Sequence, residues 1–182
     1  MERNRLVFSG SGGQGVVTAS IILAEAAVLH ENLMAVQSQS YGPEARGGAT
    51  RSDIIISNSE INYPKVIQPN VLVCLTQKAY NKFYPIIRPG GLLISDTRFV
   101  KTERKVDAQQ IELPMFQTVL DKIGKPIVFN ICMLGAVIML TDLVKPESIR
   151  KVLKARIPSN FLEMNFSALK LGIELAEELK TD

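Results

Sequence analysis

Short apolar runs alternate with longer helical segments along the first half of the chain. Residues 6–9, 71–75 and 92–96 are short, largely apolar and bounded by glycine or proline, which is the pattern of strands buried on both faces of a sheet. Residues 16–29 and 78–87 have the length and composition of helices. Because strands that alternate with helices form parallel sheets covered by helices, this order predicts an α/β fold.

Further β-rich runs cover residues 34–36 and 52–57, and residues 61–63 follow a turn at 58–60. We expect residues 52–57 and 61–63 to form a small antiparallel hairpin at the edge of the sheet. The polar stretch between the first two runs is a long loop, and loops of that length without structure of their own are usually functional or disordered.

The last third of the sequence is helical in pattern. Residues 130–143 are apolar almost throughout, and Pro146 suits the first turn of a following helix. In the final segment apolar side chains recur at steps of three and four residues, as on one face of a helix; they are Leu162, Phe166, Leu169, Ile173, Ala176 and Leu179. We therefore predict one domain, residues 1–182, with three α/β/α layers, a mainly parallel sheet and a helical C-terminal third.

Composition and charge exclude several classes of protein. The chain has 182 residues, of which 46% are hydrophobic, and a net charge of +3, so it can bury about 70% of its unfolded surface in one core. The small positive excess is not clustered into a basic stripe with aromatic residues, and we expect no nucleic-acid partner. The longest apolar run, residues 131–140, is far short of the ~20 residues of a membrane span.

The two cysteines, Cys74 and Cys132, lie far apart and within apolar runs. Cysteine in such surroundings packs as a small hydrophobic residue. Their separation matches no metal-ligand spacing, so we expect no iron–sulfur cluster and no structural zinc in this chain. The first apolar run is too short for the core of a signal peptide, and unpaired cysteines fit a reducing compartment. These features predict a cytoplasmic protein.

A glycine loop follows the first predicted strand and precedes the first predicted helix. Residues 10–15 read G-S-G-G-Q-G, which matches the G-x-G-x-x-G pattern of dinucleotide sites. Such sites also need an acidic residue at the end of the second strand, to bind the ribose hydroxyls. That strand ends Val36-Gln37-Ser38, without a carboxylate. A self-contained NAD(P)-binding domain and a turn needed only for strand–helix packing therefore remain alternatives to an anion site.

The stretch S-Q-S-Y-G-P-E-A-R-G-G at residues 38–48 is the most informative loop. Its glycines can expose backbone N–H groups, and Arg46 can bind a phosphate or a carboxylate with its forked guanidinium. The alternative is a solvated loop in which Glu44 and Arg46 form a weak surface pair. Composition does not choose between these two interpretations.

Together the two loops resemble those of the gamma subunit of 2-oxoacid:ferredoxin oxidoreductases, most of all the 2-oxoglutarate type. The resemblance rests on residues 12–15 after a strand and on residues 39–48. Further similar stretches cover nearly the whole chain; they are Tyr63-Pro64 before residues 69–73, Asn130 with residues 134–136, and residues 165–172. The pyruvate and branched-chain 2-oxoacid types of the same family share most of these motifs.

The resemblance implies a subunit that is not active alone. In that family a 2-oxoacid is oxidatively decarboxylated to an acyl-CoA, and electrons pass to ferredoxin. Thiamine diphosphate, magnesium and iron–sulfur clusters are then expected in alpha and beta partner subunits, with a delta subunit as a further candidate and with ferredoxin an indirect partner. This chain is implicated in assembly and in contacting coenzyme A. A module that serves assembly alone, without a ligand, is the remaining alternative.

We expect no catalytic and no metal-binding residue in this chain, since its single histidine, His30, ends a helix and suits the helix dipole there. Asn130 opens an apolar helix and is either a cap or a site residue. The candidate cofactor-binding residues are Gly10, Gly12, Gly13, Gln14 and Gly15 in the first loop, Ser40, Tyr41, Gly42, Pro43, Glu44, Arg46, Gly47 and Gly48 in the second, and Asn130.

Overall fold

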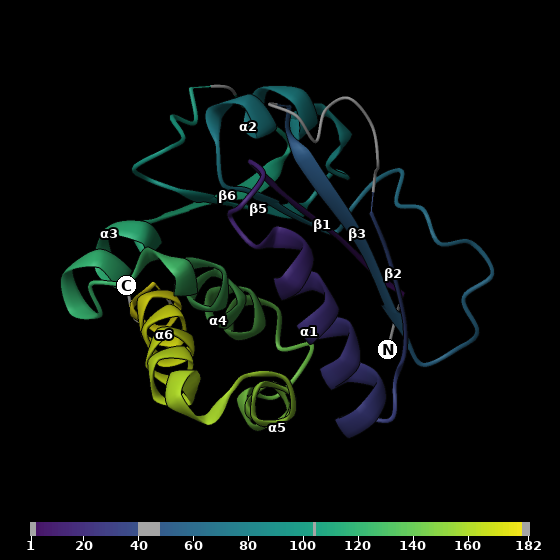
Figure 1. Ribbon diagram of the computed structural model, residues 1–182. Helices are drawn as coiled ribbons and strands as arrows, with labels where there is room; N and C mark the ends of the chain where they lie inside the picture. Colours follow the sequence, from purple (N-terminus) through teal and green to yellow (C-terminus); the bar gives the residue numbers. More distant parts are fainter. Residues whose placement is uncertain (1–2, 40–47, 104, 180–182) are drawn as a thin grey trace.

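The protein is built around a central six-stranded sheet, which the computed structural model shows edge to edge in the order β2-β3-β1-β4-β5-β6 (Figure 1). The structure describes residues 3–39, 48–103 and 105–179. The strands are β1 (Asn4–Gly10), β2 (Met34–Gln39), β3 (Thr50–Ser57), β4 (Val71–Cys74), β5 (Gly91–Asp96) and β6 (Ala108–Leu113). β1, β4, β5 and β6 run parallel, and β3 pairs antiparallel with both β1 and β2. The predicted α/β fold with a mainly parallel sheet is confirmed.

At the antiparallel edge of the sheet, the predicted run 52–57 lies in β3 but pairs with β2 and not with residues 61–63. β2 and β3 make this edge, and β2 continues to Gln39 rather than ending at residue 36. Residues 61–63 form no strand, so the predicted hairpin with residues 52–57 is wrong. The prediction failed because Pro64 cannot donate a ladder hydrogen bond and because the backbone of Val66 bonds the side chain of Asp53 instead. β6 was missed because it is a half-polar edge strand.

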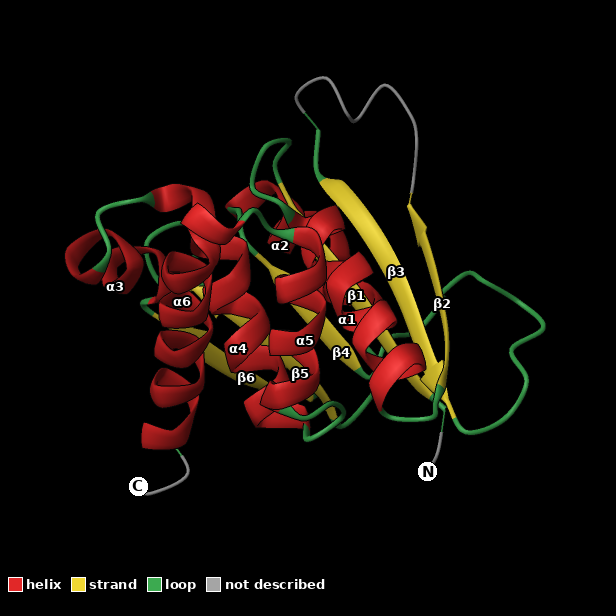
Figure 2. Cartoon of the chain, turned by 60° about the horizontal axis from the view of Figure 1, so that its bottom comes forward, coloured by secondary structure: helices red, strands yellow, loops and turns green. Residues whose placement is uncertain are grey.

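Helices cover both faces of the sheet unequally, as Figures 1 and 2 show. α2 (Gln77–Phe83) and the short helix η2 (Tyr84–Ile86) lie on one face, where they pack on Val7, Leu72 and Leu93. The opposite face carries the larger core, which includes alternate residues of the same strands. Its helices are α1 (Val16–His30), α3 (Met115–Lys122), η3 (Pro126–Val128), α4 (Phe129–Thr141), α5 (Pro146–Arg156) and α6 (Ser159–Glu178). The result is three layers with a helical C-terminal third, as predicted.

α4 lies at the centre of the larger helical layer. Every residue from Phe129 to Ile138 is buried, so this helix is apolar on all sides, as befits one enclosed by other elements. Although its apolarity resembles that of a membrane segment, none of the described helices has both the length and the hydropathy to cross a bilayer.

α4 and α6 approach each other closely at two glycines. A Cβ atom on Gly172 would lie 1.8 Å from the carbonyl oxygen of Cys132, and one on Gly135 would lie 2.3 Å from that of Leu169. Both distances are far inside van der Waals contact, and the neighbouring atoms are backbone that cannot rotate away. The glycines in the two C-terminal stretches that resemble the family therefore serve helix packing.

Gly172→Ala is expected to destabilise the protein by about 1–3 kcal/mol, because the added methyl group forces α4 and α6 apart. In an unconstrained helix the same change stabilises by about 1 kcal/mol, so the predicted sign is reversed. Urea unfolding measures the difference. Ser167→Ala, at an exposed position of the same helix, is the control and should be neutral or slightly stabilising. Equal behaviour of the two variants would contradict the packing argument.

Candidate functional site

The candidate site lies at the carboxyl ends of β1 and β4. From β1 the chain continues into α1 on one face of the sheet, and from β4 it continues into α2 on the other face. Adjacent parallel strands whose connections leave in opposite directions open a crevice at their carboxyl ends, where ligands of open α/β sheets bind. Residues 10–15, the predicted glycine loop, stand at this crevice.

The glycine loop owes its shape to two residues in the left-handed region. Gly13 has φ +87° and Gly15 has φ +74°, a conformation that costs other residues about 1–2 kcal/mol. Gly15 is the N-cap residue of α1, and no side chain caps this end of the helix. The first turn of α1 also carries no acidic residue. The helix therefore presents its positive end to whatever occupies the crevice.

Gln14 shapes the loop from within. Its Oε1 accepts a hydrogen bond from the N–H of Ser11 at 2.7 Å, and its Nε2 donates to the carbonyl oxygen of Leu75 at 3.3 Å. The side chain thus ties the loop after β1 to the loop after β4. A Cβ atom on Gly10 would lie 2.5 Å from this Oε1, so a larger residue there would displace the Gln14 amide. Gln14, predicted to bind a cofactor, is engaged by the protein itself.

Asn130 holds the other end of the loop. It lies within α4 rather than at its cap, and its Nδ2 donates to the carbonyl oxygen of Gly15 at 3.3 Å. Of the two predicted roles for Asn130, the cap is therefore wrong, because the N-cap residue is Val128. A Cβ atom on Gly15 would lie 2.6 Å from the same Nδ2, so the approach of α4 to the loop requires glycine. The structure brings Asn130 and the glycine loop together, although they are far apart in sequence.

A largely apolar hollow of about 390 Å³ opens beside the loop. Gly13, Gly15 and Asn130 line it where it meets the glycine loop. Its remaining wall comes from α1, η3, the start of α4, the junction of α5 and α6, and α6 itself; the lining residues are Thr18, Ile22, Ile127, Val128, Ile131, Ile157, Pro158, Phe161, Met164 and Asn165. Ile127 is 80% exposed and Phe161 47% exposed. This hollow suits a group that has an apolar portion beside an anionic one.

The second predicted loop begins and ends beside the glycine loop, at the end of the sheet where the carboxyl ends of β1 and β4 lie. Of its candidates, Ser40, Tyr41, Gly42, Pro43, Glu44, Arg46 and Gly47 lie outside the described residues. Its flanks are described: Gln39 pairs with Ser52, and Gly10 pairs with Thr50. Gly48 is partly exposed, and Ala49 after it is buried. This pairing places the residues that flank both loops at the same end of the sheet.

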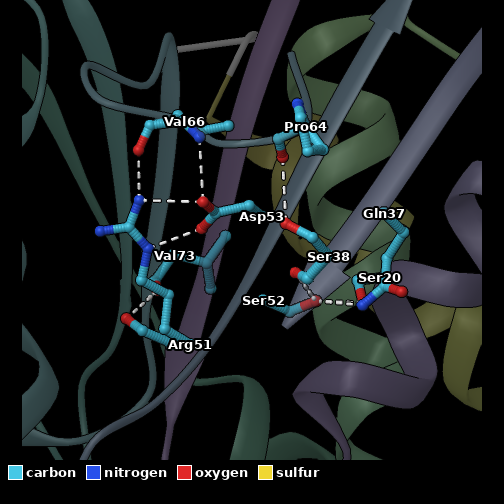
Figure 3. Close-up of polar contacts among 10 residues, drawn as sticks. Ser20, Gln37, Ser38, Arg51, Ser52, Asp53, Pro64, Val66 and Val73 are labelled. Carbon is cyan, nitrogen blue, oxygen red and sulfur yellow. Dashed lines mark hydrogen bonds and ion pairs between the residues drawn. The ribbon is translucent and has the colours of Figure 1, made fainter. Parts of the chain in front are cut away.

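Polar side chains on both faces of β3 fix these flanks, as Figure 3 shows. Facing α1, the Ser52 hydroxyl lies 2.7 Å from that of Ser20 and accepts a hydrogen bond from Gln37 at 2.8 Å. On the opposite face, Arg51 and Asp53 form an ion pair at 2.6 Å. The sequence did not indicate these contacts, because alternation of polar and apolar residues in a strand does not identify their partners.

The dinucleotide alternative loses its structural basis in this sheet. In dinucleotide-binding folds the second strand lies next to the first, so its terminal carboxylate faces the glycine loop. Here β3 separates β2 from β1. At the end of β2, Ser38 donates to the carbonyl oxygen of Pro64 at 3.0 Å. Neither the residue type nor the strand position matches a ribose site.

Asp96, at the end of β5, is a turn residue. It is fully buried and accepts hydrogen bonds from the N–H groups of Arg98 at 3.0 Å and Phe116 at 2.7 Å. Desolvation raises the pKa of its carboxyl above the ordinary value, although these hydrogen bonds and the Arg98 charge oppose the shift. Both oxygens hold the protein's own backbone, so Asp96 joins β5 to α3.

The described residues offer no group of side chains that fits a metal ion or an iron–sulfur cluster. Within residues 3–39, 48–103 and 105–179, no three His, Cys, Asp or Glu side chains gather in a way that could hold a metal ion. Cys74 and Cys132 are buried in separate cores on opposite faces of the sheet. Burial raises the pKa of each thiol to about 12, so neither supplies a thiolate at neutral pH.

Gly15→Ala is expected to destabilise the protein more than Gly13→Ala does. Both substitutions require a non-glycine residue in the left-handed region, which costs about 1–2 kcal/mol. Only Gly15→Ala also displaces Asn130, because the space around Gly13 is open. Urea unfolding of the two variants measures the difference, which should exceed about 1 kcal/mol. Equal losses would contradict the role of Asn130 in shaping the loop.

Comparison with known proteins assigns the family. The family model of pyruvate ferredoxin/flavodoxin oxidoreductases matches residues 5–175. The 2-oxoglutarate synthase subunit KorC of Methanocaldococcus jannaschii is 44% identical over 179 residues, 97% of this chain and 96% of that protein.

Solved structures agree with this assignment. The gamma subunit of a keto/oxoacid ferredoxin oxidoreductase from Geobacter sulfurreducens PCA has a TM-score of 0.87 and 38% identity, over 96% of this chain and 99% of that chain. The 2-oxoglutarate:ferredoxin oxidoreductase of Magnetococcus marinus shares the fold, with a TM-score of 0.87 and 20% identity over 98% of this chain and 32% of that chain. The chain therefore belongs to the pyruvate ferredoxin/flavodoxin oxidoreductase family, and its resemblance to the gamma subunit is confirmed.

Proposed function

We propose that this gamma subunit works in a 2-oxoglutarate:ferredoxin oxidoreductase and contributes a contact for coenzyme A. The overall reaction converts 2-oxoglutarate and coenzyme A to succinyl-CoA and carbon dioxide, and the electrons pass to ferredoxin. The choice of 2-oxoglutarate as the substrate is supported by the similarity over nearly the full length to a 2-oxoglutarate synthase subunit, at 44% identity. The pyruvate and branched-chain 2-oxoacid types are the alternatives within the family.

The chemistry at the carboxyl ends of β1 and β4 supports a contact with coenzyme A. Coenzyme A combines a charged pyrophosphate with a long, largely uncharged arm. The uncapped amino end of α1 suits the pyrophosphate, and the neighbouring hollow with Ile127 and Phe161 on its wall suits the arm. The bound state of the Magnetococcus marinus enzyme, which was solved with coenzyme A and succinyl-CoA, motivates this choice among phosphate-bearing ligands.

Thiamine diphosphate, magnesium and the iron–sulfur clusters belong, in this proposal, to partner subunits, namely alpha and beta, with delta as a further candidate. Thiamine diphosphate supplies the decarboxylation chemistry when bound there. The described residues of this chain offer no cluster of metal ligands, and the two cysteines are buried as thiols. This chain then binds and orients coenzyme A beside its partners. A reducing cytoplasm fits the unpaired cysteines.

The complex assembled from this chain and its partner subunits is expected to prefer 2-oxoglutarate. We predict a kcat/KM for 2-oxoglutarate at least about tenfold above that for pyruvate or a branched-chain 2-oxoacid, which corresponds to about 1.4 kcal/mol of discrimination. Reduction of ferredoxin in the presence of coenzyme A measures each rate. The isolated chain is the control and should be inactive with all substrates. A preference for pyruvate would contradict the proposed substrate.

Arg46→Ala in the assembled complex is expected to raise the KM for coenzyme A by about tenfold or more. Loss of one charge-assisted hydrogen bond to a phosphate costs about 1.5–3 kcal/mol. The KM for 2-oxoglutarate should not change, which separates a contact to coenzyme A from a general defect. Lys154→Ala, at an exposed position of α5, is the control. An unchanged KM for coenzyme A would favour a subunit that serves assembly alone.

A further inference from the structure

A second hollow lies at the other end of the parallel strands, where their amino ends are. It has a volume of about 670 Å³ and is lined by Arg3, Arg5, Ile55, Tyr63, Lys65, Ile67, Gln68, Arg88 and Pro89. Arg5 belongs to β1, while Gln68 and Arg88 stand shortly before β4 and β5. The whole length of the strands therefore separates this hollow from the glycine loop. We call it the basic hollow.

The part of the wall that contains no strand, around Lys65 and Ile67, is held in place by hydrogen bonds. Asp53 in β3 accepts a hydrogen bond from the N–H of Val66 at 2.9 Å, and the Arg51 guanidinium donates to the Val66 carbonyl oxygen. Figure 3 shows Arg51 and Asp53 joined to Val66 and to each other. Because Val66 is buried between Lys65 and Ile67, this arrangement presents the two flanking side chains outward.

Backbone contacts fix the remaining wall. The N–H of Arg5 donates to Oδ1 of Asn70 at 2.9 Å, and the N–H of Asn70 donates to the carbonyl oxygen of Arg5 at 2.7 Å. The N–H of Arg88 donates to the carbonyl oxygen of Pro69 at 3.1 Å. Arg5 and Arg88 are thereby anchored to the same short segment, so the cations are brought together by the fold.

The positive charge of the basic hollow is not neutralised within the described chain. Four cationic side chains line it, namely Arg3, Arg5, Lys65 and Arg88, and none forms an ion pair with a carboxylate of the residues that the structure describes. Among the described residues, the Arg3 guanidinium donates to a backbone carbonyl oxygen, that of Glu60, at 2.8 Å. Like charges gathered in this way repel one another, and an anionic partner would relieve the repulsion.

Exposed apolar side chains at the same place indicate the kind of partner. Ile67 is 74% exposed and Tyr63 60% exposed. A small polyanion would leave both in water, whereas a polypeptide surface can cover them. Arginine and tyrosine are enriched in protein interfaces and among the residues that dominate their energetics. The combination fits an acidic protein surface that also carries an apolar residue.

We propose that the basic hollow docks an acidic surface of a partner subunit of the same enzyme. The proposal rests on the proposed function, since it takes the partner from the complex in which this chain works. The surface at the amino ends of the parallel strands then contacts a partner subunit, while the glycine loop at their carboxyl ends contacts the ligand. The two roles lie at opposite ends of the strands.

The test is a double charge reversal, Lys65→Glu with Arg88→Glu, in the full chain co-expressed with its partner subunits. Lys151→Glu with Lys154→Glu, at exposed positions of α5, is the control with the same change of charge. The complex is purified through a tag on a partner subunit, and the retained amount of this chain is measured at about 0.05 and 0.5 M salt, since salt screens exposed charges. Thermal melting of each isolated chain verifies folding.

We expect the reversal in the basic hollow to lower retention at least about tenfold at low salt, and the control to leave it unchanged. If the reversal unfolds the chain, Lys65→Gln with Arg88→Gln replaces it and should weaken the salt dependence of retention. Equal retention of wild type and reversal variant overturns the proposal. So does normal assembly combined with tripolyphosphate binding that the reversal abolishes, because the occupant would then be a small polyanion.

The outcomes also separate this proposal from the proposed function. A reversal variant that assembles normally in a complex that oxidises 2-oxoglutarate overturns the docking surface alone. A wild-type chain that does not assemble with those partners overturns both.

Discussion

Two side-chain amides, those of Gln14 and Asn130, hold the glycine loop on which the candidate site depends against the loop after β4 and against α4. Gln14 joins the loop after β1 to the loop after β4, and Asn130 reaches from α4 to the backbone of Gly15. Because the protein supplies these hydrogen bonds itself, the loop is ordered before any ligand arrives. Preorganisation of this kind lowers the conformational entropy lost on binding.

The position of β3 decides what this loop can do. Inserted antiparallel between β1 and β2, β3 separates β2 from the glycine loop and so removes the strand that would carry a ribose-binding carboxylate. The same insertion brings Gly48 and Thr50 to the edge where the glycine loop stands. A sequence pattern shared with dinucleotide sites is thereby placed in a sheet of different topology, where the amino end of α1 remains the feature best suited to an anion.

Much of the fold was predictable because its strands are short apolar runs bounded by glycine or proline. β6 and the true partner of β3 were not, since a half-polar strand and a pairing between distant segments leave little local signal. The candidates of the first loop followed from glycine spacing and those of the second from the resemblance to the family, whereas the apolar wall with Ile127 and Phe161 comes from segments far from the loops in sequence. Asn130 illustrates the difference, because its local context suggested a cap and only the packing of α4 showed its partner.

We propose that the glycine loop and the apolar hollow beside it, at the carboxyl ends of β1 and β4, contact coenzyme A in the assembled enzyme. Hydrogen exchange of the complex with and without coenzyme A tests this most directly. The account predicts slower exchange in residues 11–18 and 127–131 when coenzyme A is added, and no change in residues 61–68 at the opposite edge. Protection confined to the partner subunits would contradict it.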